Sequence, residues 1–276
     1  MTQKNPTYLN TVLKTLDDIN KDITFSFSVP SSDKEYSSKI LNTDQLKRLF
    51  KSIIESPSQT SLFTQTFNSI MEENILNEDV SNFTILDKLV YFIKLRINSI
   101  SDIYTIDLSE NSKVVDDSYG YDLNYHVENV VNTVESPQEL EISEISPYKV
   151  ICCLPNIKVE NTLENELHKN LDVEIKTPEE LRQLVGDTFI NEITKYVKSI
   201  SLSAENIDFN ALDFKSRITI VSKLPSTIIN KILKYMEAYK TISEKITTCN
   251  FTCYDSEGKV VKLEEKIPFD TTFFNE

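Results

Sequence analysis

Few residues in this sequence belong to the types that usually carry catalysis. The chain has only two histidines, His126 and His168, and no Gly-x-Ser-x-Gly nucleophile motif accompanies them. Its three glycines, Gly120, Gly186 and Gly258, are isolated, whereas phosphate-binding loops need clustered glycines so that the backbone can approach the anion. We therefore expect no nucleotide-binding loop, and we expect both histidines to be structural or solvated.

The cysteines are the one set that could hold a metal ion. Cys249 and Cys253, together with Cys152 and Cys153, would supply four thiolates, a ligand set of structural zinc sites. If Cys249 and Cys253 share one strand, however, their Cα atoms lie about 13 Å apart at ~3.3 Å per residue, which suits neither a disulfide nor chelation. Adjacent strand residues point to opposite faces, so Cys152 and Cys153 would not easily share one metal. A turn at Asn250 would bring the first pair together; otherwise we expect reduced thiols and no cofactor.

Carboxylates are abundant, but their spacing selects no catalytic pair. With 43 acidic and 29 basic side chains, the formal net charge is −14, so neighbours such as Glu72 and Glu73 arise by chance. A glycoside hydrolase needs two carboxylates that face each other across a cleft. A cell-wall hydrolase with paired carboxylates is one alternative, but the main expectation is that the chain is not an enzyme.

The acidic balance and the apolar pattern also limit the partners. A nucleic-acid-binding protein needs a basic face, whereas the few arginines here are scattered. The longest apolar stretches, Leu89–Ile93 and Val150–Leu154, fall far short of the ~18 residues of a membrane-spanning helix. The opening residues, Met1–Pro6, lack a long apolar core, so we expect no signal peptide. We expect a cytoplasmic protein that binds no nucleic acid and spans no membrane; its oligomeric state stays open.

Periodicity predicts the elements of the first hundred residues. Ile23–Val29 alternates apolar and polar residues, which indicates a half-buried strand, and Tyr36–Leu41 could pair with it as a hairpin. Thr43 is a predicted helix N-cap. Apolar residues at helical spacing predict helices over Thr7–Ile19, Thr43–Ile54, Leu62–Leu76 and Thr84–Ile100.

The second half of the chain begins with a different kind of segment. Leu108–Pro147 is acidic, and the partial alternation of Tyr121–Val134 favours a strand or hairpin arm within a linker. Val150–Leu154 then predicts a buried strand, and Thr177-Pro178-Glu179-Glu180 predicts a helix start with a capping box. The remaining predicted elements are helices at Thr162–Asn170, Leu212–Lys223 and Ser226–Ile246, and a hairpin of Asn250–Tyr254 with Val260–Ile267.

These elements predict an α+β fold, because strands and helices are segregated rather than alternating. We expect it to be mostly helical, with short antiparallel strands or hairpins near the N-terminus, in the middle and at the C-terminus. Three consecutive regions follow: an N-terminal strand and helices (1–107), an acidic insert or linker (108–147), and a C-terminal α+β region that ends in a hairpin (148–276).

The C-terminal pair Phe273-Phe274 is the candidate partner-binding site. Two adjacent phenylalanines so close to a charged chain end either pack in the protein's own core, which is the commoner outcome, or dock on a partner. Strand edges at Ile23–Val29 and at the C-terminal hairpin could also be extended by a partner strand.

Several segments resemble the baseplate hub proteins of T-even-type contractile-tailed bacteriophages. They run in the same order along most of the chain, from about residue 30 to 274, and leave 108–147 uncovered. The segments are Pro30–Glu35, Leu46–Phe50, Phe83–Leu89, Phe92–Ile100, Leu224–Ser226, the helix Ile228–Tyr239 and the final Phe-Phe pair.

The resemblance implies a hub subunit or a hub-assembly protein with no established catalytic residues, whose partners are other baseplate or tail hub proteins. A structural subunit would stay in the tail baseplate of the virion, whereas an assembly chaperone would act in the host cytoplasm and leave. Some relatives have a Cys-x-x-Cys pair before the final hairpin, and the wider spacing of Cys249 and Cys253 departs from it. A cytoplasmic adaptor unrelated to phage is an alternative.

Overall fold

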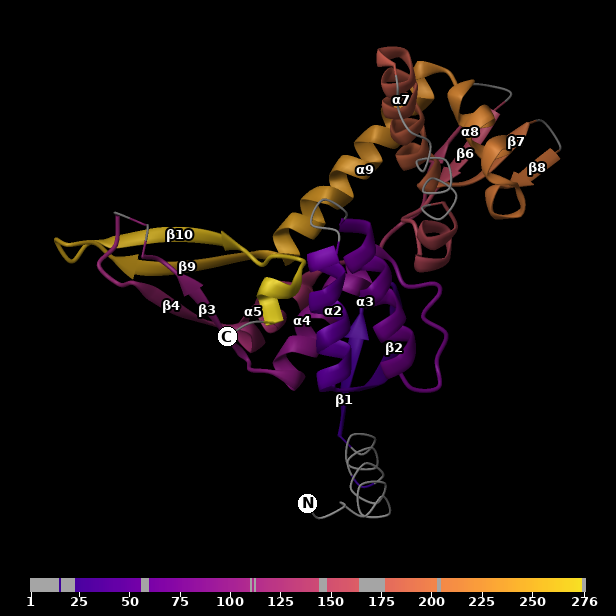
Figure 1. The fold of residues 1–276 in the computed structure, drawn as a ribbon. Coiled ribbons are helices and arrows are strands. Elements are labelled where there is room, and N and C mark those ends of the chain that lie inside the picture. Colours follow the sequence, from indigo (N-terminus) through magenta and orange to yellow (C-terminus); the bar gives the residue numbers. More distant parts are fainter. Residues whose placement is uncertain are drawn as a thin grey trace. The chain divides into compact units, whose positions relative to one another are not determined.

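A computed structural model describes residues 15, 23–55, 60–109, 111, 113–143, 148–163, 177–202 and 205–274. The predicted helix Thr7–Ile19 lies outside this part of the chain except at Thr15, which is helical, and the predicted helix Thr162–Asn170 lies mostly outside it. The chain forms two compact units, whose elements are labelled in Figure 1. Unit 1 comprises Met1–Val80, Leu89–Thr133 and Thr247–Glu276, and unit 2 comprises Ser81–Lys88 and Val134–Ile246.

The fold is α+β, with helices and short antiparallel strand pairs, as the sequence predicts. Unit 1 begins with the hairpin of β1 (Thr24–Val29) and β2 (Ser32–Lys39). Alternate residues of β1 are buried and exposed, because successive strand residues point to opposite faces and only one face covers the core. In the described part of the chain, no helix combines the length and the apolar character needed to cross a membrane.

Three helices of unit 1 follow the predicted pattern closely. They are α2 (Thr43–Glu55), α3 (Thr60–Asn74) and α4 (Ile85–Ser99), of which α4 begins in unit 2 and enters unit 1 at Leu89. The apolar stripe of α4 is wide, and its residues at 89–93 are all buried. A helix buried on so much of its circumference is a central element of a core.

The core of unit 1 is aromatic and includes the end of the chain. The short 3-10 helix η3 (Thr271–Phe274) carries Phe273, whose ring centroid lies 4.9 Å from that of Phe92. Phe274 lies at the same distance from Phe92, and Phe269 lies 4.5 Å from it. Arg96 Nε donates a hydrogen bond to the Phe273 carbonyl oxygen at 2.7 Å, which fixes the backbone at this position.

Two hairpins of unit 1 pack face to face, and Figure 1 shows them lying side by side. One joins β3 (Ile103–Asp107) to β4 (Ser118–Asp122), and the other joins β9 (Thr248–Tyr254) to β10 (Val260–Lys266). The rings of Tyr119 on β4 and Phe251 on β9 stack with their centroids 4.5 Å apart. The C-terminal hairpin therefore forms as the sequence predicts, but its stability depends on a partner hairpin from the middle of the chain.

The segment after β4 differs from the predicted strand over Tyr121–Val134. It forms helix α5 (Leu123–Asn129) and the 3-10 turn η1 (Val131–Thr133). Asp122 is the N-cap, and its carboxylate accepts hydrogen bonds from the backbone N–H groups of Asn124 and Tyr125. This cap satisfies orphan donors of the first helical turn and so favours a helix over the partial alternation of the sequence.

Unit 2 contains a four-stranded antiparallel sheet in the order β5-β6-β7-β8. Its core joins the sheet to helices through buried residues such as Val150, Ile193 and Ile232. The strands are β5 (Leu140–Ile142), β6 (Tyr148–Cys152), β7 (Val197–Leu202) and β8 (Glu205–Asp208). The helices are α7 (Pro178–Lys195), η2 (Phe209–Ala211), α8 (Phe214–Ser222) and α9 (Ser226–Ile246), together with residues 157–163.

The two units divide the chain differently from the predicted regions 1–107, 108–147 and 148–276. Unit 1 is built from three separate pieces of sequence, and the acidic segment is divided between the units at Thr133 and Val134. Long-range packing causes the difference, because β9, β10 and η3 belong with the N-terminal helices and not with their neighbours in sequence.

Candidate binding groove between two helices

The candidate site begins at the start of α2, where two amides cap the helix. Asn42 Oδ1 accepts a hydrogen bond from the Gln45 N–H at 2.9 Å, and the Asn42 N–H donates to Gln45 Oε1 at 3.2 Å. This is the reciprocal arrangement of a capping box. The Leu46 N–H also donates to the Asn42 carbonyl oxygen, so the cap lies at Asn42, one residue before the predicted Thr43.

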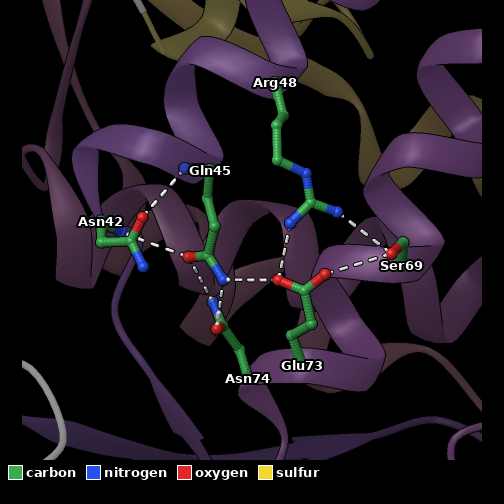
Figure 2. A network of polar contacts seen from close by, with 6 residues as sticks. All are labelled: Asn42, Gln45, Arg48, Ser69, Glu73 and Asn74. Atoms are coloured by element: carbon green, nitrogen blue, oxygen red, sulfur yellow. Dashed lines mark hydrogen bonds and ion pairs between the residues drawn. The ribbon is translucent and has the colours of Figure 1, made fainter. Parts of the chain in front are cut away.

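The same Gln45 side chain continues into a network that joins α2 to α3 (Figure 2). Gln45 Nε2 donates to Asn74 Oδ1 at 2.8 Å and to Glu73 Oε2 at 3.2 Å. Arg48 uses two nitrogens, Nη1 to Glu73 Oε2 at 2.7 Å and Nη2 to Ser69 Oγ at 3.1 Å. Each of these polar side chains thus has at least one hydrogen-bond partner on the other helix, which holds the facing sides of α2 and α3 in place.

Glu73 is ionised within this network. Partial burial acts to raise the pKa of the carboxyl, but hydrogen bonds from Arg48 and Gln45 and the charge of Arg48 outweigh it. The pKa of Glu73 therefore lies below its usual value. A carboxylate held in this way does not serve as a proton donor near neutral pH.

Beside the network, α2 and α3 enclose a groove of about 350 Å³. Two cationic side chains, Arg48 and Lys51, lie on its α2 side, and Leu62 is its one aliphatic residue. Hydroxyl and amide groups complete the lining, which consists of Arg48, Lys51, Ser52, Leu62, Gln65, Thr66 and Ser69. This lining contains no carboxylate, imidazole or thiol, and it offers hydrogen bonds and positive charge for binding.

In the sequence, Arg48 is one of a few scattered arginines and lies within the resembling segment Leu46–Phe50, but neither observation predicts this groove. One local signal was present, since Ser69 and Glu73 are four residues apart and so share a face of a helix. The pairing of that face with Arg48 spans 25 residues to Glu73 and 21 to Ser69. Helical spacing alone does not predict such a contact.

The predicted partner-binding residues, Phe273 and Phe274, are placed in the core of unit 1. Both are buried, and both rings contact Phe92. The structure thus has the core-packed alternative that the sequence left open, and in this conformation the two rings present no surface to a partner.

The weak metal candidates, Cys249 and Cys253, are not brought together. They lie on the buried face of β9 with Phe251 between them, and the regular pairing of β9 with β10 contains no turn at Asn250. Burial raises the pKa of Cys249 to about 12, whereas a metal ligand must be a thiolate. Within the described ranges, no group of three or more His, Cys, Asp or Glu side chains is arranged to hold a metal ion.

Of the two histidines, the structure describes His126, and its environment is that of a structural residue. His126 is buried in α5, and its Nδ1 is hydrogen-bonded to the Tyr121 hydroxyl at 3.0 Å. Burial raises the pKa of Tyr121 to about 12, so the phenol stays protonated. His168 lies outside the described residues.

Comparisons of the chain with protein-family models, with curated proteins and with solved structures found no match.

Proposed function

We propose that this chain is a non-enzymatic protein that acts in the baseplate hub of a contractile phage tail, as a structural or an assembly protein, by binding other tail proteins. The observation that carries the proposal is the order of the resembling segments, which extend from Pro30 to Phe274. Each segment alone is only moderately specific, but their shared order covers most of the chain.

Two of the resembling segments, Phe92–Ile100 and the final Phe-Phe pair, pack against each other in unit 1, which supports the proposal. Leu49, Phe92 and Phe273 come from three different segments, and all three are buried. Phe92 contacts Phe273 directly. The segments Leu224–Ser226 and Ile228–Tyr239 lie in unit 2.

The groove between α2 and α3 suits binding by charge and hydrogen bonds. The positive charge of Lys51, beside the Arg48–Glu73 pair, favours a carboxylate of a partner protein, and the groove's hydroxyl and amide groups can orient it. The cell-wall hydrolase alternative receives no support here, because the lining lacks the two facing carboxylates that such catalysis requires.

The decisive experiment is recovery of the tagged full-length chain from host cells that express the genes flanking its own, with partners identified by mass spectrometry. Recovery of tail or hub proteins is the expected result. Mass spectrometry of purified particles then separates a retained subunit from an assembly chaperone that leaves. Absence of the chain from both particles and hub-assembly intermediates would overturn the proposal.

A second experiment tests the groove by reversing the charge of Lys51. We expect Lys51→Glu to reduce recovery of a tail partner roughly tenfold, since it replaces attraction by repulsion. Lys47→Glu is the matched control, because Lys47 is exposed on the same helix and does not line the groove. Equal losses in both variants would point to general charge repulsion rather than to the groove.

A further inference from the structure

The end of the β9–β10 hairpin carries a group of exposed apolar side chains. Among the described residues, eight large hydrophobic side chains are exposed, and three of them belong to this end: Val115 (64%), Tyr254 (60%) and Val260 (61%). Tyr254 and Val260 are direct partners across the hairpin. The Val115 N–H donates to the Tyr254 carbonyl oxygen at 3.2 Å, which places Val115 beside them. We refer to Val115, Tyr254 and Val260 as the tip patch.

Tyr254 and Val260 of the tip patch face away from the packed side of their hairpin. Phe251 and Cys253 of β9 are buried on the face that meets the β3–β4 hairpin. Because strand residues alternate between faces, Tyr254 lies on the opposite face, and its partner Val260 shares that face. Nothing in the described part of the chain buries these side chains, so their exposure belongs to the free hairpin face.

The turn that follows Tyr254 holds the tip patch in a fixed geometry. Asp255 Oδ1 accepts hydrogen bonds from the N–H groups of Glu257 and Lys259, both at 2.8 Å. The Gly258 N–H donates to the Asp255 carbonyl oxygen at 3.0 Å, and Gly258 adopts a positive φ of 76°, which glycine tolerates without strain. A surface ordered before binding loses less conformational entropy when a partner arrives.

The border of the tip patch is acidic. Residues 113–117 and 254–260 carry four carboxylates and two lysines, a local net charge of −2. One of those lysines, Lys259, already forms an ion pair with Glu257. An apolar centre that contains an exposed tyrosine, bordered by charge, is the composition of a protein interface.

We propose that the tip patch is a docking surface for a partner protein whose contact surface has an apolar pocket bordered by lysine and arginine. Complementary charge would steer such a partner to the patch. A second copy of this chain would bring an identical acidic border against the first, which disfavours self-association through this surface. This docking proposal rests on the proposed function, because the proposed function supplies the class of partner, the tail proteins.

The test compares three full-length chains, each tagged and co-expressed with the flanking genes. The double variant Tyr254→Ser with Val260→Thr is expected to recover at least one tail protein roughly tenfold less than the wild type. Tyr125→Ser is the matched control, because Tyr125 is 59% exposed in α5, away from the tip patch, and it should recover the same proteins as the wild type. Circular dichroism and the thermal midpoint verify that each variant is folded.

A charge variant tests the same surface without removing its apolar groups. Asp116→Lys with Glu257→Lys reverses the sign of the border charge, so it is expected to slow association with a basic partner and to reverse the effect of salt on that association. If either the charge variant or the Tyr254→Ser, Val260→Thr variant misfolds, the remaining variant still tests the docking surface.

The outcomes separate the two proposals. Equal recovery by the wild type and both tip variants overturns the docking surface and leaves the proposed function standing. Recovery of no tail protein by the wild type overturns the proposed function, and this partner assignment with it. Sedimentation that shows a self-associated wild type and a monomeric double variant would make a second copy the occupant and overturn the basic partner.

Discussion

Phe273 is a residue whose sequence position is compatible with two roles, and its contacts in the structure distinguish them. Its position near the chain end suits a partner anchor as well as a core residue. In the structure its ring packs on Phe92 and its carbonyl oxygen accepts a hydrogen bond from Arg96, whose guanidinium also lies 5.2 Å from the ring centroid. These contacts predict a stabilising role for Phe273.

We expect Phe273→Ala to lower the free energy of unfolding by about 3–5 kcal/mol, because it removes a buried aromatic ring and leaves a cavity. Urea denaturation of the full chain measures the change. The exposed control Tyr125→Ser should alter stability by no more than about 0.5 kcal/mol. A Phe273→Ala chain that is fully stable but fails to bind a partner would favour the docking alternative.

Glu73 offers a residue-level prediction about pH. Its pKa is lowered in the folded state, so ionised Glu73 stabilises the fold above its unfolded pKa, and this contribution disappears as the pH falls through the folded pKa. The pair with Arg48 is partly exposed, so solvent screening limits its contribution to about 1 kcal/mol or less.

Glu73→Gln should therefore be less stable than the wild type at pH 7, and the difference should shrink below about pH 4. Urea unfolding at both pH values measures it. Glu72→Gln is the control, since it removes an exposed carboxylate one residue away. A difference for Glu73→Gln that does not change with pH would contradict the assigned role.

At the scale of elements, the start of α4 shows how side chains determine where a helix begins. The Asp87 carboxylate accepts hydrogen bonds from the Thr84 N–H at 2.6 Å and the Thr84 hydroxyl at 2.8 Å. One residue later, buried Lys88 forms an ion pair with Glu160 of the helical segment 157–163. These contacts attach the first turn of α4 to a distant part of unit 2.

Breaking this ion pair on one side should be costly, since it leaves a charge without its partner in a mostly buried place. We expect Lys88→Met to lower the free energy of unfolding by about 3–5 kcal/mol. Lys88→Met combined with Glu160→Leu should cost less than the single change. Denaturation of both single variants and the double variant measures the coupling, and strictly additive losses would argue against the pair.

The spacing of apolar residues predicted most elements correctly. It was wrong where a side chain that caps a helix favoured a different structure or a different start. The alternation of β1 and the helical stripe of α4 appear as expected. The segment after Tyr121 is a helix instead of a strand, because Asp122 caps it. The start of α2 shifts to an Asn42 cap for a similar reason, since Gln45 reciprocates.

At the scale of the whole molecule, the division into two units makes a prediction about unfolding. Ile232 is fully buried in the core of unit 2, where its neighbours include Ile193. Because this core is internal to unit 2, we expect Ile232→Ala, which should cost about 2–5 kcal/mol, to accelerate amide hydrogen exchange mainly in Val134–Ile246. Equal acceleration in β1 and β2 would mean that the units unfold as one.

The sequence by itself determined whether most segments form a helix or a strand, and it reduced the number of plausible catalytic and nucleotide-binding functions. Each element is encoded by spacing within roughly ten residues, and the scarcity of histidine and clustered glycine is visible without any structure. The tertiary structure alone decided that Phe273 is buried, that Arg48 meets Ser69 and Glu73, and that β9 packs on the hairpin containing β4. Such contacts join residues far apart in the chain, and they depend on which complementary faces pack best in three dimensions, which no local period specifies.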